Sequence, residues 1–205
     1  MSSAALFAQF AAKNIVEKAR IRNLVAQRHM RIIAGKFRSR HLKGTPPPGL
    51  RPTSDKLRET VFNILGERVQ DCTFIDGCAG MGAIGIEAIS RGAAFVYFVE
   101  QSRKACQMIR ENLNSLEVKD GFKIIEMDLK KGLATIEAPV NIGFIDPPYD
   151  RDDLYDAALT HFHGDLLILE HSRRRVLPEN AGGLRQIRSL VQGDAALAFY
   201  IRENM

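Results

Sequence analysis

The apolar stretch 141–145 ends at the tetrapeptide Asp146, Pro147, Pro148 and Tyr149. An apolar run followed by two prolines predicts a buried strand that ends in a loop, because proline neither donates to a strand ladder nor continues a helix. Ligands of open α/β sheets bind beyond the carboxyl ends of the strands. The Asp146 carboxylate and the carbonyls of this turn would supply acceptors beside the flat ring of Tyr149. Such a group suits the exocyclic amine of a nucleobase; the alternative is an ordinary Pro-Pro turn with a surface tyrosine.

A second pattern lies upstream, where a GxGxxG sequence, Gly80 to Gly85, follows a predicted strand and opens a helix. Glycines let backbone amides approach a ligand closely, and Glu100, 100 − 80 = 20 residues after Gly80, lies where an acidic residue holds ribose hydroxyls. The pattern alone fits S-adenosylmethionine, a nicotinamide dinucleotide, or a glycine turn that binds nothing. Asp76 could face a cationic methionine amino group and Asp128 an adenine amine. We expect the ends of the first and fourth strands to share one cavity.

Strand and helix patterns alternate from Cys72 onward, which predicts a mostly parallel, doubly wound α/β sheet with helices on both faces. The predicted strands are Cys72–Asp76, Ala94–Glu100, Phe122–Met127, Asn141–Ile145 and Asp165–Glu170. A closing hairpin, Leu184–Val191 and Ala195–Ile201, brings the total to seven strands. Helices are expected over Ile86–Ser90, from the cap Ser102 to Leu116, and over Leu154–Phe162.

The chain divides into three regions. Residues 1–29 form an N-terminal extension with a helical pattern, and residues 30–52 form a small basic β-hairpin followed by a proline-rich linker. Residues 53–205 are expected to form the doubly wound α/β domain, in which Thr53 or Ser54 caps the first helix.

Basic residues are concentrated near the N-terminus. Ten Lys or Arg and no Asp or Glu lie between residues 18 and 54; residues 1–17 sum to zero, so residues 55–205 carry 5 − 10 = −5. Such a block suits a polyphosphate partner, since neutralised phosphates release counterions, although a solvated basic arm has the same composition. No apolar run is long enough for a membrane helix. Three cysteines without a CxxC spacing suggest neither a disulfide framework nor a zinc site and favour a reducing, cytoplasmic location.

Together these motifs resemble the class I S-adenosylmethionine-dependent methyltransferases, and within them the bacterial 16S ribosomal RNA guanine-N2 methyltransferase (RsmD-like) family. The resemblance runs from Met30 to about Ile201. Its most specific parts are the segments 30–36 and 49–63 and the tetrapeptide 146–149. The sequence departs from the family pattern in the 29 residues before Met30 and in the side chains of the glycine turn, Gly77-Cys78-Ala79 with Met81.

The resemblance implies a Rossmann-like fold, S-adenosylmethionine as cofactor, no metal, and 16S ribosomal RNA or the assembling small subunit as partner of a monomeric enzyme. The implied catalytic residues are Asp146, Pro147, Pro148 and Tyr149. The implied cofactor-binding residues are Asp76, Gly77, Ala79, Gly80, Gly82, Glu100, Gln101, Asp128, Leu129 and Asp146. The implied RNA-binding residues are Arg31, Lys36, Arg38, Arg40, Lys43, Arg51, Thr53, Lys56 and Arg58.

Other functions remain open from the sequence. A DNA amino-methyltransferase acting on adenine N6 or cytosine N4 would use the same tetrapeptide but generally needs a sequence-reading domain. A protein-glutamine methyltransferase would leave the basic block unexplained, and an idle RNA-binding module would keep the sheet only as a scaffold. Arg173, Arg174 and Arg175 fit either a phosphate contact or a solvated loop. The histidines at 161 and 163 fit surface positions better than a metal site.

Overall fold

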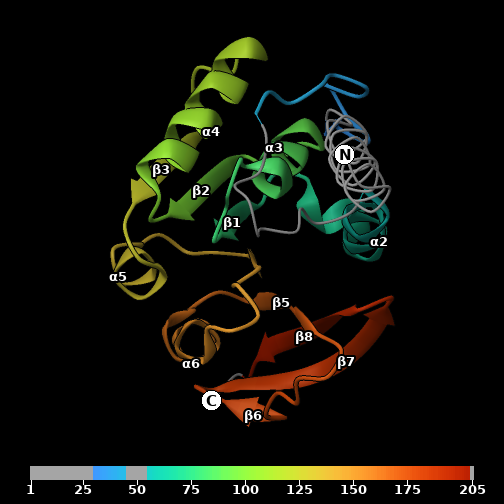
Figure 1. Ribbon diagram of the computed structural model, residues 1–205, viewed down its shortest axis with the longest axis vertical. Helices are drawn as coiled ribbons and strands as arrows, with labels where there is room; N and C mark the ends of the chain where they lie inside the picture. The colour runs from blue at the N-terminus through green and yellow to red at the C-terminus, as the bar shows by residue number, and fades with distance from the viewer. Residues whose placement is uncertain (1–29, 45–54, 204–205) are drawn as a thin grey trace, which may run out of the picture.

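One eight-stranded sheet runs through the protein in the computed structural model, which describes residues 30–44 and 55–203 (Figure 1). Its strand order is β3-β2-β1-β4-β5-β8-β7-β6. Strands β1 to β5 are parallel where they neighbour one another, and β8, β7 and β6 continue the sheet antiparallel. The strands are β1 Thr73–Gly77, β2 Phe95–Glu100, β3 Phe122–Glu126, β4 Ile142–Ile145, β5 Leu166–Ser172, β6 Asn180–Ala181, β7 Leu184–Gln192 and β8 Ala195–Arg202.

The α/β prediction is confirmed, and the count of seven strands is wrong by one. The additional strand is β6, whose two residues pair with the start of β7. Two residues are too short for the period-two pattern that identifies a strand in sequence. The closing hairpin is present as β7 and β8, which the Gly193-Asp194 turn joins.

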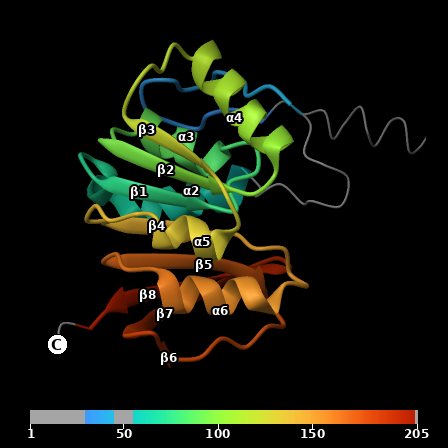
Figure 2. The ribbon, with the colours of Figure 1, turned by 90° about the vertical axis from the view of Figure 1, so that its left-hand side faces the viewer.

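Helices cover both faces of the sheet, as Figure 2 shows. The helices are α2 Asp55–Leu65, η1 Gly66–Val69, α3 Ala83–Ser90, α4 Arg103–Ser115, α5 Leu129–Ala134 and α6 Asp152–His161. One apolar cluster joins α2, α3 and α4 to the sheet through residues such as Phe74 and Phe144, and a second joins α5 and α6 through Ile75 and Ile145. Successive residues of a strand thus enter opposite clusters, because side chains alternate between the faces of a sheet.

Segment 30–44 packs on α3 and α4 without forming a strand. A single antiparallel bridge joins Arg31 and His41, so the expected two-stranded hairpin is not confirmed. The backbone amides of Ile33 and Ala34 instead donate to the carboxylate of Glu87 in α3, at 2.8 and 3.0 Å. Three apolar side chains of the segment, Ile32, Phe37 and Leu42, are buried in the α2–α4 cluster.

Several predictions fall outside the described residues: the helical extension 1–29, the proline-rich linker, and the cap by Thr53 or Ser54. The helix that this cap would begin is present as α2. Within residues 30–44 and 55–203, no helix is both long and apolar enough to span a membrane.

Candidate active site

The carboxyl ends of β1 and β4 meet where the strand order reverses. Gly77 of β1 pairs with Ile145 of β4, and the Asp146 amide donates to the Gly77 carbonyl at 3.2 Å. Helix α3, which follows β1, and α6, which follows β4, pack on opposite faces of the sheet. Such a switch point leaves a crevice beyond the strand ends, which is where doubly wound sheets bind their ligands.

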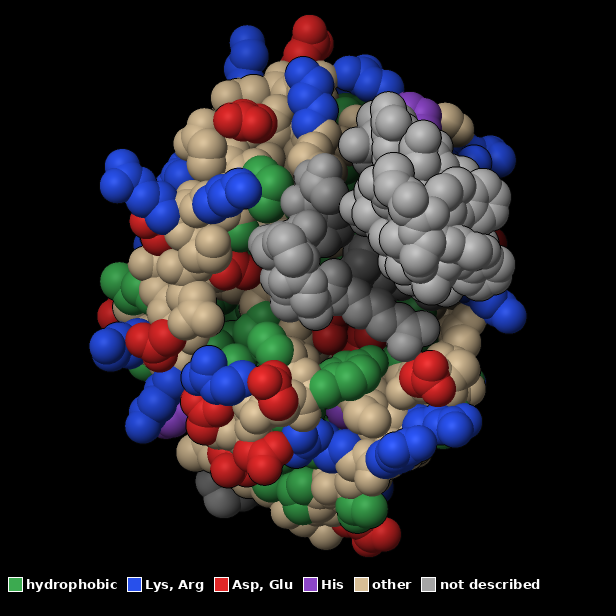
Figure 3. Space-filling model, in the orientation of Figure 1, with side chains coloured by type: hydrophobic (Ala, Val, Ile, Leu, Met, Phe, Trp, Pro, Cys, Tyr) green, Lys and Arg blue, Asp and Glu red, His purple; other side chains and the backbone are tan. Residues whose placement is uncertain are grey.

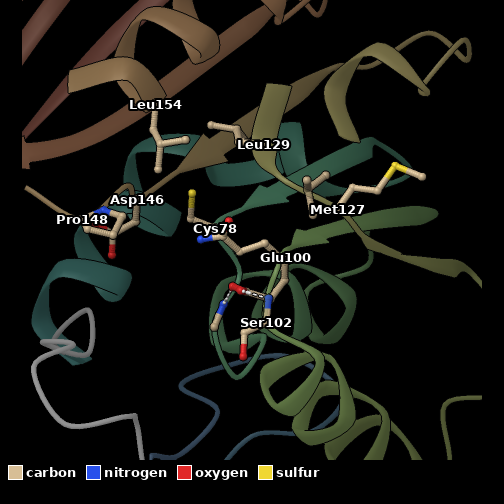
Figure 4. A pocket seen from close by; sticks show the side chains of 11 residues that line it. Cys78, Glu100, Ser102, Met127, Leu129, Asp146, Pro148 and Leu154 are labelled. Atoms are coloured by element: carbon tan, nitrogen blue, oxygen red, sulfur yellow. Dashed lines mark hydrogen bonds between the residues drawn. The ribbon is translucent and has the colours of Figure 1, made fainter. Parts of the chain in front are cut away.

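A cavity of about 300 Å³ occupies this crevice. Both the glycine turn and the 146–149 loop line it, so the expected proximity of the two motifs is confirmed (Figure 4). Six lining residues were anticipated from sequence: Gly80, Glu100, Gln101, Leu129, Asp146 and Pro148. Five were not: Cys78, Val99, Ser102, Met127 and Leu154.

The glycine turn needs its glycines at specific points. Gly80 and Gly82 have φ values of +56° and +82°, in the left-handed region that favours glycine. Gly85 lies in the first turn of α3, and a Cβ there would approach the Phe98 ring and Val96 of β2. The glycines therefore give the turn its backbone path and allow α3 to pack closely on the sheet.

Glu100, at the end of β2, holds the glycine turn in place. Its Oε2 accepts from the Gly80 amide at 2.9 Å and its Oε1 from the Ser102 amide at 2.8 Å; both bonds are drawn in Figure 4. The carboxylate is thus oriented at the cavity wall by two backbone donors. A carboxylate held there can accept hydrogen bonds from vicinal hydroxyls, the chemistry expected of it from sequence.

Asp76 lies behind the cavity wall rather than in it. Its side chain is buried, and Oδ2 accepts from the Gly85 amide at 2.8 Å. Burial raises the pKa of Asp76 well above its usual range; the Gly85 amide opposes this rise, and the nearby Asp146 and Glu100 add to it. Asp76 therefore connects β1 to the first turn of α3. Gly77, Ala79 and Gly82, also expected to bind the cofactor, do not line the cavity.

Asp128 also bonds to the backbone. It is the N-cap of α5, where its Oδ1 accepts from the Lys131 amide at 3.1 Å and its Oδ2 lies 3.5 Å from Lys131 Nζ. The Lys131 amide, followed by the Lys131 charge, lowers the pKa of Asp128. The cavity is lined by its neighbours Met127 and Leu129 and not by Asp128 itself.

The 146–149 loop is held by hydrogen bonds from neighbouring residues. The Pro147 carbonyl accepts from the Tyr155 hydroxyl at 3.4 Å, and the Pro148 carbonyl from the Arg151 amide at 3.0 Å. The Tyr149 hydroxyl lies 3.5 Å from Glu170 Oε1 at the end of β5, and Tyr149 does not line the cavity. Of the four residues of this loop, Asp146 and Pro148 line the cavity, and both are labelled in Figure 4.

Cys78 contributes an apolar wall. Burial, reinforced by the charges of Glu100 and Asp146, raises the pKa of its thiol far above the ordinary value, so the group stays protonated at neutral pH. This is the environment of a packing residue and not of a nucleophile. In residues 30–44 and 55–203, no cluster of His, Cys, Asp and Glu has the geometry to hold a metal ion.

The residues expected to bind RNA differ in exposure. Six are exposed: Arg31, Lys36, Arg38, Arg40, Lys43 and Lys56. Arg58 is fully buried, where Nη2 donates to the Arg31 carbonyl at 2.9 Å and to Asp55 Oδ1 at 2.8 Å. Arg58 thus holds segment 30–44 against α2 and does not reach the surface, where a phosphate would be. Arg51 and Thr53 lie outside the described residues.

The charges of the cavity match a cationic ligand. Within residues 30–44 and 55–203, two carboxylates, from Glu100 and Asp146, and no Lys, Arg or His line it. Figure 3 shows acidic and apolar side chains near the centre of this face and Lys and Arg mostly toward its rim. A cation with an apolar, planar part would fit such walls, while a nucleic-acid backbone would be attracted to the rim.

Comparison with known proteins finds a family model and several proteins to which this chain is similar. The family model described as "Conserved hypothetical protein 95" matches residues 30–201. The chain is 35% identical over 180 residues to the protein named ribosomal RNA small subunit methyltransferase D of Escherichia coli strain K12, covering 85% of this chain and 90% of that one. It is 34% identical over 181 residues to the putative rRNA methyltransferase YlbH of Bacillus subtilis, covering 83% and 98%. A solved structure, the putative methyltransferase yhhF from Escherichia coli, superposes with a TM-score of 0.73 at 30% identity, covering 86% of this chain and 99% of that one.

Proposed function

The chain belongs to the family described as Conserved hypothetical protein 95, and we propose that it transfers a methyl group from S-adenosylmethionine to the exocyclic N2 amine of a guanine in small-subunit (16S) ribosomal RNA. The observation that carries this proposal is the single cavity that Gly80 and Glu100 line from one side and Asp146 and Pro148 from the other. The names of the relatives, which are ribosomal RNA methyltransferases, support the substrate class.

The cavity fits S-adenosylmethionine on three counts. Its two carboxylates complement a cationic sulfonium compound, Glu100 can accept from ribose hydroxyls, and Val99, Met127 and Leu129 provide an apolar wall for an adenine. The cofactor would supply an electrophilic methyl group. Gly80 and Gln101 would contact it from the glycine turn and the end of β2. Asp76 and Asp128 would act mainly through the backbone that they hold, because neither lines the cavity.

Asp146 would align the target amine. Guanine N2 is a weak nucleophile because its lone pair is delocalised into the ring, so a hydrogen bond from N2–H to the Asp146 carboxylate would raise its electron density and direct it at the methyl group. Positioning of this kind can lower a barrier by about 7–11 kcal/mol in well-aligned systems. The proton becomes acidic as the new bond forms and passes to Asp146 or to water.

Tyr149 would stack on the guanine after it leaves its helix, since an enzyme that modifies a base must first expose it. In the structure its hydroxyl is directed to Glu170 of β5, which holds the ring outside the cavity. The exposed basic residues of segment 30–44 would bind the phosphates around the site.

The test is to map methylated nucleotides by mass spectrometry in small-subunit RNA incubated with the protein and the methyl donor. The variant Asp146→Ala should lower the rate by at least about 100-fold, the range for loss of a positioned acid or base. Asp150→Ala is the matched control, since Asp150 is an exposed carboxylate one residue beyond the tetrapeptide. Full methylation by the Asp146→Ala variant would show that Asp146 does not align the target amine.

The same reaction separates the alternatives when protein-free RNA, naked DNA and small-subunit particles are offered with a radiolabelled donor. We expect label on RNA or particles. Label on DNA alone would instead support an amino-methyltransferase of DNA, and no label on any substrate would support the idle RNA-binding module.

A further inference from the structure

The connection after β5 carries a cluster of positive charge that the proposed reaction has not used. Arg173, Arg174 and Arg175 follow directly on Ser172, the last residue of β5. Arg173 and Arg174 are exposed, whereas the side chain of Arg175 is only 20% exposed. The three arginines therefore differ in what they do, although the sequence presents them as one run.

Arg175 joins the segment that follows β5 to the 146–149 loop, which holds the target base in the proposed reaction. Its Nη2 donates to the Tyr149 carbonyl at 2.7 Å and pairs with Asp152 Oδ1 at 2.6 Å. Its guanidinium also lies over the Tyr155 ring, 4.0 Å from the ring centre. Since Tyr155 in turn donates to the Pro147 carbonyl, the arginine run and the 146–149 loop form one hydrogen-bonded unit.

The side chains of Arg173 and Arg174 are exposed to solvent beside this hydrogen-bonded unit. The Arg173 amide donates to the Asp194 carbonyl at 2.9 Å, which fixes the backbone against the β7–β8 turn. Arg173 Nε is 4.0 Å from Asp194 Oδ1, at the limit of an ion pair, with the arginine side chain 51% exposed. For Arg174, no carboxylate in residues 30–44 and 55–203 lies within ion-pair distance.

We infer that Arg173 and Arg174 bind RNA phosphates next to the target guanine, and that Arg175 ties this contact to the loop that holds the base. The inference rests on the proposed function. Segment 30–44 packs on α3 and α4, while the arginine run follows β5 on the other side of β4, as the two ribbon views show (Figures 1 and 2). The RNA would then be held on both sides of the guanine that enters the cavity.

The dependence of affinity on salt measures this contact. Each phosphate that a protein neutralises contributes roughly 0.7 to the slope of log K against log [salt] for single strands and about 0.9 for duplexes. Loss of two such contacts should make the slope less steep by about 1.4–1.8. A solvated loop that touches no phosphate would leave the slope nearly unchanged.

The experiment compares RNA binding by the full chain over a range of KCl concentrations, with the small-subunit RNA or particle that the protein methylates. The double variant Arg173→Ala/Arg174→Ala should show the reduced slope, and Arg173→Lys/Arg174→Lys should restore it because the charge is kept. The matched control is Lys119→Ala/Lys123→Ala, which removes the same charge from exposed positions just before and within β3, at the opposite edge of the sheet order. Affinity for S-adenosylmethionine reports that each variant is folded.

Equal slopes for the alanine double variant and its control would overturn the inference while leaving the proposed function intact. Failure of the unmodified protein to bind or methylate small-subunit RNA would overturn both. The two failures are therefore distinguishable in one set of measurements.

Discussion

The substitution Asn112→Ala should weaken both the fold and the glycine turn, because one side chain holds two functional segments together. Asn112 lies fully buried in α4. Its carboxamide oxygen accepts from the Lys43 amide at 2.7 Å, and its nitrogen donates to the carbonyls of Lys43 and Met81 at 3.2 Å each. Lys43 belongs to the basic segment 30–44, and Met81 lies between the two glycines of the turn.

The expected loss of stability follows from those three bonds. The Met81 carbonyl would remain buried without this donor, which costs about 1–3 kcal/mol. The two bonds to Lys43 are partly buried, so water can replace them in part, and each is worth about 0.5–1.5 kcal/mol. The free energy of unfolding should therefore fall by about 2–6 kcal/mol.

Two measurements test this prediction: urea unfolding and calorimetric titration with S-adenosylmethionine. Both the free energy of unfolding and the affinity for S-adenosylmethionine should fall in Asn112→Ala, since the glycine turn, which we propose contacts the cofactor, would no longer be held to α4. Asn114→Ala is the matched control, because Asn114 is exposed on the same helix. The reasoning is refuted if Asn112→Ala matches this control in unfolding and in cofactor affinity.

Three further substitutions test the contacts that α3 makes with the sheet and with segment 30–44. Gly85→Ala places a Cβ 2.8 Å from Phe98 Cζ, so overpacking of about 1–3 kcal/mol should outweigh the gain in helix propensity and lower the urea midpoint. Asp76→Asn keeps an acceptor for the Gly85 amide; because burial raises the pKa of Asp76, the unmodified protein binds more protons folded than unfolded and loses stability as pH rises above about 4. Asp76→Asn should lose that dependence on pH. If the difference in unfolding free energy between the unmodified protein and the variant stays constant with pH, the prediction is wrong. Glu87→Gln removes an acceptor from the amides of segment 30–44 and the ion pair with Arg91, so unfolding measurements should show roughly 1–3 kcal/mol of destabilisation, with weaker RNA binding.

The sheet was predictable because its central strands are buried on both faces. Such strands appear as continuous apolar runs with turn residues after them, and β1, β2, β4 and β5 all have this pattern. Parallel strands joined by helices then place their carboxyl ends at one edge. That rule predicts from the sequence that Asp146 and Gly80 lie at one cavity, as the structure confirms.

Short elements and segments whose backbone bonds to side chains were less predictable. β6 has two residues and α5 has six, too few for a periodic pattern. Segment 30–44 has the alternation of a hairpin, but Glu87 and Ser90 of α3 bind its backbone amides, and this contact spans more than 50 residues of sequence. The sequence likewise does not distinguish Arg58 from surface arginines, since only the packing of α2 shows that it is buried.

The acidic residues of the site also have a second role that the sequence does not reveal. Asp76, Glu100 and Asp128 are at positions where an acid is expected to meet the cofactor, and each accepts a hydrogen bond from a backbone amide. These bonds fix the turn and the first residues of the helices whose ends surround the cavity. Because the backbone is already fixed, it loses less conformational entropy when a ligand binds, and this smaller loss favours higher affinity. Substitution of these acids should consequently lower cofactor affinity even where the carboxylate never touches the cofactor. Asp146, which lines the cavity beside Pro148, is the acid whose loss should act on the chemical step.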